Sequence, residues 1–575
     1  MSNIFNSVRL TKPKGSSFNL SYENKFTAKF GDLIPFFHQE VLPGDKIKVG
    51  QQHLMRLAPT LAPLMQQVDV YMHYFFVPNR LIWDDWEDFI SNNHNKVAGV
   101  SKIAPTMPKI EIDLTDVSDA STDAKLALLK SGSLADYFNF PSIEEFDVNS
   151  VGKVQVNALP FRAYTLIYNE YYRDQNLIDE VNISKSSGVL SGRDNVIQQN
   201  LMLIRKRAWL HDYFTSALPW PQYGASPVRI PFELNQGEIY YKPFVSTGNG
   251  QTPFDDYSGT VLRNRDGSTL DNVQLDGDIE QAGHGSLRTN ADGRLAYQQG
   301  SNTSNLGVDN TKNLGFRFSS AAVPSVTDMR RAYRVQEWLE RQAVGGSRYI
   351  EQILSHFGVR SSDARLQRPE YLCGIKTPLI MSEVQQTSAS VDDSNAVQPL
   401  GQLGGNGTSV GQNFAFSRHF EEHGQLIGIL SVMPKTSYFQ GLPRKYSRES
   451  WEDFYWPEFA NIGEQAIKNK EIYYDYEQGV SNRNESEFGY APRYAEYRYN
   501  PNEVHGEFRN SLRFWHLGRK FGSCPDLNRS FIEYDNKNID NALAVSSDVA
   551  HPLYCQFFNN VSAYRLIPKY ADAYL

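Results

Sequence analysis

The 575-residue sequence has only three cysteines, Cys373, Cys524 and Cys555. They are too few and too widely spaced for a disulfide framework or a paired-cysteine metal site. Residues 1–18 lack the charged-then-apolar layout of a secretory signal, and no apolar run approaches the ~20 residues of a membrane-spanning helix. We therefore expect a soluble protein, made in a reducing compartment, that leaves its cell by a route other than secretion.

The sequence also lacks an excess of positive charge. Its 57 lysines and arginines face 65 aspartates and glutamates, for a net charge of -8. A protein whose main task is to grip nucleic acid is usually basic, so any such contact must be local. Residues 1–30 are an exception, with a single acid, Glu23, against these basic residues: Arg9, Lys12, Lys14, Lys25 and Lys29. We interpret this segment as an extended basic arm; the alternative is a frayed, solvated terminus.

Aromatic residues, in contrast, are abundant. They make up 13% of the chain, with 32 tyrosines and 33 phenylalanines. Aromatic side chains suit half-buried β-sheet surfaces and anchor large protein interfaces. A hydrophobic content of 40% and a charged content of 21% are typical of a chain that folds around a core. At this length we expect one elaborated domain or several ordinary ones.

Apolar periodicity predicts secondary structure along the chain. Residues 68–77 (VDVYMHYFFV) alternate as a strand that becomes buried on both faces. The periodicity predicts helices at 81–90 (with Asn79 as the cap), 161–175 and 325–344, and strands at 425–432, 490–499 and 511–517. Many short strands separated by long excursions predict a mainly β fold, an antiparallel sandwich whose loops carry the helices.

Residues 246–313 differ from the rest of the chain in composition. Gly, Asn, Asp, Ser, Thr and Gln dominate this stretch. Roughly seventy residues are too many for a passive connection within a compact domain. We expect either disorder or a polar surface insertion with irregular structure.

One motif suggests metal chemistry. His419 and His423 fit the H-x-x-E-H spacing of a zinc peptidase. That chemistry needs a helix, whereas Phe414, Phe416 and Phe420 recur at the even spacing of a strand. On a strand the two histidines would lie about 13 Å apart, too far for one zinc ion.

Other catalytic patterns are weaker still. Gly404, Gly405 and Gly407 miss the spacing of a phosphate-binding glycine loop, and no nucleophile motif with supporting context is found. The triplet Arg205, Lys206 and Arg207 could contact phosphate, although such triplets usually lie solvated at a helix end. We expect no catalytic residue, metal site or cofactor.

Several segments, in the same order along the chain, resemble the major capsid proteins of the microvirus family of small tailless bacteriophages. They include HYFFVPNRLIWDDWEDFI (73–90), LPFRAYTLIYNEYYRDQNL (159–177), HDYFTSALPWPQ (211–222), DARLQRPEYL (363–372), DFYWPEFANIGEQ (453–465) and FWHLGR (514–519). Residues 246–313 have no match and stand where the gokushovirus-like branch carries a variable surface insertion.

The resemblance implies a fold and a set of partners. The fold is an eight-stranded antiparallel jelly roll over residues 31–575, with large helical and loop insertions. The function is structural: pentamers would form a small T=1 icosahedral shell around circular single-stranded DNA, with Arg9, Lys12 and Lys14 facing the DNA. Partners would be copies of the chain, the DNA, a small basic packaging protein, minor phage proteins and a host surface receptor. Assembly would occur in the bacterial cytoplasm, and the product would be the virion.

Two other interpretations stay open. A surface jelly-roll protein that binds or cleaves glycans would also be rich in aromatics, with paired carboxylates for acid–base chemistry. A spike or receptor-binding component of a virion is the second. A shell subunit should elute as pentamers or particles, whereas a lectin or hydrolase should elute as a monomer or small oligomer.

Overall fold

The computed structural model of the chain describes residues 15–91, 104–115, 122–145, 152–190, 192–222, 326–387, 390–391, 397–398, 401, 403–477, 481–547 and 549–569, and between them the seven short strands that lie within 238–317. The chain divides into two compact units. One comprises Met1–Ala225 with Leu339–Leu575, and the other comprises Ser226–Trp338. Each unit is described by itself.

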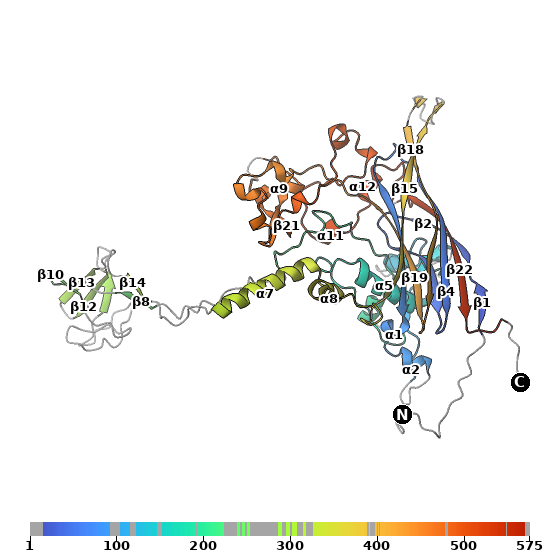
Figure 1. Cartoon of the computed structure of the whole chain (residues 1–575), viewed down its shortest axis with the longest axis horizontal. Coiled ribbons are helices and arrows are strands. Elements are labelled where there is room, and N and C mark those ends of the chain that lie inside the picture. The colour runs from blue at the N-terminus through green and yellow to red at the C-terminus, as the bar shows by residue number, and fades with distance from the viewer. Residues whose placement is uncertain are drawn as a thin grey trace, which may run out of the picture. The chain divides into compact units, whose positions relative to one another are not determined.

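Nine strands of the first unit form one antiparallel sheet that curls back on itself (Figure 1). They are β1 (Ser16–Asn19), β2 (Tyr22–Ala28), β3 (Ile34–Val41), β4 (Lys46–Leu57), β5 (Val68–Pro78), β15 (Glu370–Gln385), β18 (Leu403–His419), β19 (Gly424–Pro434) and β22 (Leu553–Arg565). Both β1 and β2 pair with β22, at successive stretches, so together they fill one of eight positions. The order is β1/β2-β22-β4-β18-β15-β5-β19-β3.

Strand β15 joins two halves of this sheet. Its first ten residues pair with β5, and residues 380–385 pair with β18. The first half is therefore β2-β22-β4-β18, and the second half is β3-β19-β5-β15. Buried side chains from both halves, among them Val49, Phe557 and Leu426, share one core. Two four-stranded halves packed around one core form a jelly roll, so the predicted fold is confirmed.

The two halves differ in what covers their outer faces. In β4 and β22 buried and exposed residues alternate, so one face lies in the core and the other is uncovered. Strand β19 is buried at every position, and β5 at nearly every one. The outer side of the second half packs into another core, where Phe75 and Ile427 meet Phe161. The predicted strand at 68–77, buried on both faces, is confirmed.

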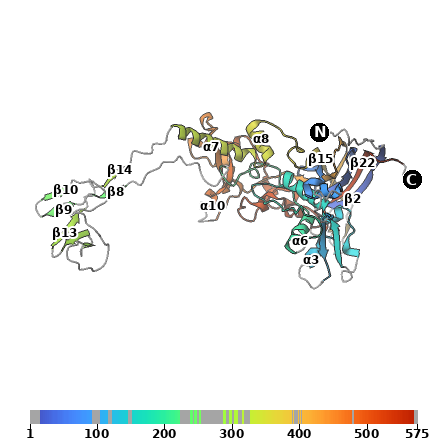
Figure 2. The ribbon, with the colours of Figure 1, turned by 90° about the horizontal axis from the view of Figure 1, so that it is seen from below.

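The helical cover of the second half comes from the segment that follows β5 (Figure 2). Its elements are α1 (Asn79–Ile82), α2 (Trp86–Ile90), β6 (Lys109–Asp113), α3 (Thr122–Ala127), α4 (Leu134–Tyr137), β7 (Lys153–Asn157), α5 (Leu159–Ile167) and α6 (Gly192–Gln199). A π-helical turn, Tyr168–Tyr172, continues α5, so the helix predicted over 161–175 is found with a change of pitch. Helices α7 (Val326–Gly345) and α8 (Tyr349–Phe357) precede β15, and α7 matches the predicted helix at 325–344.

The single helix predicted over 81–90 is wrong. Two short helices stand there instead, separated by Trp83 in an extended conformation. The indole of Trp83 is fully buried and donates to Ser187 Oγ at 2.8 Å, which requires the chain to turn. Asn79 is the first helical residue rather than a cap, and its side-chain oxygen faces Gln425.

The segment between β19 and β22 packs around a third core. It carries β20 (Glu464–Lys468), α9 (Asn469–Ile472), α10 (Ser481–Glu485), β21 (Glu487–Pro492), α11 (Arg529–Ile532) and α12 (Lys537–Asp540). The predicted strand at 490–499 is wrong beyond Pro492, because Tyr494 adopts a left-handed backbone with φ 62° and a 3-10 turn follows. The strand predicted at 511–517 is also wrong, since Arg513–Trp515 forms a 3-10 turn. The strand predicted at 425–432 is confirmed as β19.

The second unit contains short antiparallel strands. They are β8 (Glu238–Tyr241), β9 (Phe244–Thr247), β10 (Gly250–Pro253), β11 (Ser286–Thr289), β12 (Leu295–Gln299), β13 (Asn302–Gly307) and β14 (Leu314–Arg317). Five form a sheet in the order β10-β9-β13-β12-β11, and β14 pairs with β8. The composition of 246–313 did not predict these strands, and much of that stretch, including 254–285, lies outside the described residues.

In the first unit, β16 (Ser390–Val391) pairs with β17 (Val397–Gln398) as a two-stranded ribbon. Across the described residues, the helices are too short or too polar to cross a membrane.

Candidate functional site: a pocket lined by arginine and tyrosine

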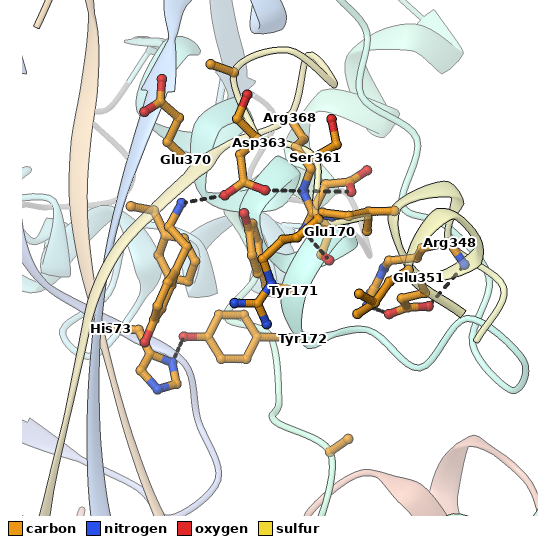
Figure 3. A pocket seen from close by; sticks show the side chains of 18 of the residues that line it. His73, Glu170, Tyr171, Tyr172, Arg348, Glu351, Ser361, Asp363, Arg368 and Glu370 are labelled. Atoms are coloured by element: carbon orange, nitrogen blue, oxygen red, sulfur yellow. Dashed lines mark hydrogen bonds and ion pairs between the residues drawn. The ribbon is translucent and has the colours of Figure 1, made fainter. Parts of the chain in front are cut away.

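A cavity of about 1040 Å³ opens on the first unit beside the second half of the sheet (Figure 3). Strands β5 and β15 supply one wall and the π-helical turn after α5 supplies another, with α8 and the loop before β15 at its rim. The lining is rich in arginine and tyrosine: Arg207, Arg348, Arg360, Arg368, Arg418, Tyr171, Tyr172 and Tyr371.

The π-helical turn places two of these tyrosines. Helix α5 starts with Pro160 in its first turn, where a missing N–H costs nothing, and it is buried at eight of its nine positions. A π turn fits one more residue into the helical turn than an α-helix does, and such turns often occur at functional sites. Here it brings Tyr171 and Tyr172 to the same cavity wall. Tyr171 Oη donates to the carbonyl of Pro369 at 2.6 Å, which fixes the start of β15 against the turn.

A neutral histidine lies deep in the cavity wall. His73 Nδ1 is 2.8 Å from Tyr172 Oη, and the two rings stack with centroids 5.9 Å apart. The Tyr371 ring lies at a steep angle to the same imidazole, with centroids 5.9 Å apart. Burial, reinforced by the positive charge of Arg207, lowers the pKa of His73 to about 4. The imidazole is therefore uncharged at neutral pH, and its hydrogen bond to Tyr172 holds the π-helical turn against β5.

Three of the arginines are neutralised by neighbouring carboxylates. Arg368 Nε lies 3.4 Å from Asp363 Oδ1, and its guanidinium stacks on Tyr171 at 4.3 Å. Arg348 pairs with Glu351 at 3.4 Å, and Arg418 pairs with Glu370 at 2.8 Å. The first two pairs are local, within the loop before β15 and at the start of α8, whereas the third joins the end of β18 to the start of β15.

Arg207 is different. Its Nη1 donates to Ser431 Oγ at 2.7 Å, and its guanidinium lies 4.2 Å from the centre of the Tyr71 ring. Within the described part of the chain, no carboxylate lies at ion-pair distance from it. Burial lowers the pKa of Arg207, although an arginine stays charged at neutral pH. The cavity thus presents a cation that lacks a counter-charge, flanked by aromatic rings, which favours an anionic group.

The same groups do not form a catalytic set. His73 is already engaged by Tyr172, and Ser361 and Ser362 of the lining make no hydrogen bond to it in the part of the chain that the structure describes. No cluster of three or more metal-ligating side chains occurs among the described residues either. The arrangement can hold a partner or an anion; it does not activate a nucleophile.

The whole chain, beyond the pocket, matches known capsid proteins. The family model described as "Capsid protein (F protein)" matches residues 7–575. The chain belongs to this capsid protein family. It is 38% identical over 549 residues to "Capsid protein VP1" of Bdellovibrio phage phiMH2K, covering 94% of this chain and 91% of that protein. It is 34% identical over 620 residues to "Capsid protein VP1" of Chlamydia phage 1, covering 99% and 97%. The identity to "Capsid protein VP1" of Spiroplasma virus 4 is 33% over 554 residues, covering 94% and 92%.

Membership confirms the resemblance to gokushovirus-like microviruses that the motifs carry. A capsid protein is a structural subunit and not an enzyme, it assembles with copies of itself, and it is located in the virion. The glycan-cleaving alternative is therefore set aside.

The predicted nucleic-acid residues of this capsid protein are only partly described. Arg9, Lys12 and Lys14 lie outside the described residues. The triplet at 205–207 does not form one basic patch at a helix end. Arg205 lies over the Tyr168 ring at 5.9 Å, Lys206 is exposed and its backbone forms a bridge with Asp32, and Arg207 enters the pocket. Binding of DNA by these residues stays a prediction.

The residues that match the zinc-peptidase motif do not form a helix. His419 ends β18, and His423 stands directly before β19, so residues 420–422 form the reversal between the two strands. Glu422 is bound by Arg80 Nε at 2.7 Å. The expectation that this sequence forms no helix is met, although only its first residue lies in a strand.

The pocket is not predicted by the sequence, although the segments that build it carry family motifs. In the sequence, His73 and the YNEYY run at 168–172 predict a strand and a helix, and together with the DARLQRPEYL segment they resemble family motifs, but nothing local indicates that they meet. The accumulation of tyrosine in one helix turn was the available signal, since buried tyrosines normally need hydrogen-bond partners.

A pH experiment tests the neutral imidazole. A histidine whose folded pKa is below its usual value stabilises the fold fully above pH ~6.5, and that stability is lost as the pH falls towards 4. We expect His73→Gln, which keeps a hydrogen-bonding group but cannot titrate, to lose less stability than wild type between pH 7 and pH 4.5. Urea unfolding at both pH values measures this, with His505→Gln as the exposed control. Identical losses in wild type and His73→Gln would contradict a buried neutral His73.

Proposed function

We propose that the chain is the major subunit of a small T=1 icosahedral shell around circular single-stranded DNA. One observation supports it most directly beyond family membership. The excursion after β19 exposes a group of large aromatic side chains, at 47% to 61% of their full area: Trp451, Phe454, Tyr455 and Trp456. A lone soluble protein rarely exposes such a patch, whereas a shell subunit covers it with its neighbours.

Co-expression with the other phage proteins tests the shell. Electron microscopy of purified material should show small isometric particles, and size exclusion should show pentamers or particles rather than monomers. A well-folded, strictly monomeric product under those conditions would refute the proposal. A spike component, the remaining alternative, would be found attached to particles that a different subunit builds.

The proposal includes nucleic acid and further partners. The basic residues of 1–30 would neutralise phosphate at the inner surface, and a small basic packaging protein would supply further charge because the chain as a whole is acidic. Minor phage proteins would complete the particle. Two of the relatives are described as phages of Bdellovibrio and Chlamydia, which supports assembly in a bacterial cytoplasm.

The polar insertion at 246–313 would serve host attachment. It falls within a compact unit of its own, Ser226–Trp338, and the motifs shared with the family lie outside it. A separate unit can be varied without disturbing the jelly roll, which suits a surface selected by different receptors. We propose that copies of this unit gather at the three-fold axes on the outside of the shell.

Deletion of the insertion tests this role. We expect a variant in which residues 246–313 are replaced by a short glycine–serine linker to form particles in normal yield but to lose adsorption to host cells. Limited proteolysis of intact wild-type particles should cut first within 246–313. Normal adsorption by the deletion variant, together with protection from protease, would contradict the proposal.

A further inference from the structure

On the uncovered face of the first half of the sheet, charged, aromatic and amide side chains stand in rows. These outward side chains come from alternate residues of β2, β22, β4 and β18, and the pairing of the strands sets them in rows. Tyr564 stands directly beside Lys46, and Tyr554 beside Arg56. We call this surface the outer β-face and define it by these residues: Glu23, Lys25, Lys46, Lys48, Gln52, Leu54, Arg56, Val410, Gln412, Phe414, Tyr554, Gln556, Phe558, Asn560 and Tyr564.

Aromatic rings on this face are accessible from outside. Phe414 is 60% exposed and Phe558 is 40% exposed. The cross-strand neighbour of Phe414 on β4 is Gly50, which has no side chain. The ammonium group of Lys48 lies 5.5 Å from the centre of the Phe414 ring. The Phe414 ring therefore has a free surface and a cation nearby, whereas Phe558 stands between Glu23 and Gln52 of the neighbouring strands.

A hollow lies near the middle of the outer β-face. Its volume is about 320 Å³, and its walls include Leu54, Val410 and Phe558, together with the amide side chains of Gln52, Gln412 and Gln556. Amides both donate and accept hydrogen bonds, so they can meet the edge of any nucleobase. Apolar walls with amide edges suit a flat heterocycle better than an ion.

The charge of the outer β-face is opposite to that of the chain. Four cations, Lys25, Lys46, Lys48 and Arg56, stand on it with one carboxylate, Glu23, which Lys25 approaches to 3.4 Å and Gln556 also contacts. The chain as a whole carries a net charge of -8. The face is thus a local site for an anionic polymer.

The predicted basic arm is joined to the chain at the border of this face. Strand β1 starts at Ser16, and its Ser17 pairs with Tyr564. Gly15 lies so close to Tyr564 that a Cβ atom there would collide with the phenol ring. In the sequence, Lys14 and Lys12 precede Gly15 by one and three residues.

We propose that the outer β-face is a stacking platform for single-stranded DNA, on which unpaired bases lie against Phe414 and Phe558 while the lysines meet the phosphates. The inference rests on the proposed function, because it names where the enclosed DNA is held. Proteins that bind single strands without sequence preference combine such rings with a cationic track. On this face the rings alternate with lysines and amides, a pattern that fits a single strand of alternating bases and phosphates.

Two kinds of substitution separate stacking from charge. Binding of fluorescent oligothymidylate to the unassembled subunit should weaken roughly tenfold for each of Phe414→Ala and Phe558→Ala, with the salt dependence unchanged. Lys46→Gln and Lys48→Gln should each lower the slope of log affinity against log salt by about 0.7. Phe357→Ala, which removes an exposed ring on α8, is the control and should bind as wild type does. Phe414→Leu keeps apolar volume without a ring and should behave like Phe414→Ala.

Ultraviolet cross-linking of DNA in intact particles gives an independent result. Cross-linked peptides should map to β18 and β22. The inference would be overturned if the ring and lysine variants bound oligothymidylate as wild type does, or if the cross-links were confined to other segments. Neither result would contradict the proposed shell. Loss of particles by the ring variants with unchanged oligothymidylate affinity would show that the face joins copies of the chain, and would also overturn it. Particles that hold no DNA would refute the proposed function instead.

Discussion

Replacing Asp212 with alanine is expected to lower the free energy of unfolding by about 3–5 kcal/mol, because it removes the acceptor at the centre of a buried network. Asp212 Oδ1 accepts the backbone N–H of Phe214 at 3.0 Å and that of Thr215 at 2.8 Å. Its Oδ2 accepts the hydroxyls of Thr436 at 2.7 Å and Tyr438 at 2.8 Å. Burial and the adjacent carboxylate raise the pKa of Tyr438 well above its usual range, so the phenol stays a donor and would be left without its acceptor.

Urea unfolding of the unassembled subunit measures the effect. Asp212→Asn keeps one acceptor oxygen and should lose less stability than the alanine variant. Glu507→Ala, an exposed acid, is the control and should change the free energy of unfolding by less than about 0.5 kcal/mol. An Asp212→Ala subunit as stable as wild type would show that the network is not needed for the fold.

The network explains what the sequence motifs could and could not reveal. Asp212 lies in the segment HDYFTSALPWPQ, and Arg519, which donates to Tyr438 Oη at 3.4 Å, closes the segment FWHLGR; Tyr438 begins a third segment, YFQGL (438–442). Tertiary packing brings these three segments, spread over some three hundred residues of the sequence, into one network, and no local pattern contains that information.

The elements that were predicted correctly are those in which apolar residues recur at the regular spacing of a strand or a helix. Strand β5 alternates and then becomes continuously apolar, and α7 repeats at helical spacing, so a local window suffices. The errors occur where the contacts or the backbone conformation of a single residue interrupt the element that the apolar spacing predicts. Trp83 breaks a helical pattern to reach Ser187, and Tyr494 ends a strand by adopting a left-handed backbone. The order of strands, the π-helical turn and the pocket depend on distant partners and were not accessible from the sequence.

Neutralising the basic arm should have the largest effect on DNA. We expect the variant with alanine at Arg9, Lys12 and Lys14 to form particles of normal size with a reduced DNA content. If each side chain meets one phosphate, the slope of log affinity against log salt should fall by roughly 2, since a single-strand contact contributes ~0.7. Between 50 and 200 mM salt, wild type should then lose about twentyfold more affinity than the variant. Oligothymidylate binding across that salt range and the absorbance ratio of purified particles provide the two measurements.

A matched control separates the effect of removing the arm's charges from the effect of changing the net charge of the chain. Replacing the exposed lysines Lys109, Lys130 and Lys520 with alanine removes the same three charges from other parts of the surface. Counterion release is a local effect of cations that touch phosphate, so this control should keep the wild-type slope. The arm variant should differ from the ring variants of the outer β-face as well, because it removes charge without removing a stacking surface. It should bind with a shallower salt dependence, whereas Phe558→Ala should bind more weakly at every salt concentration. An unchanged slope and DNA content in the arm variant would place the DNA contacts of the shell elsewhere on the chain.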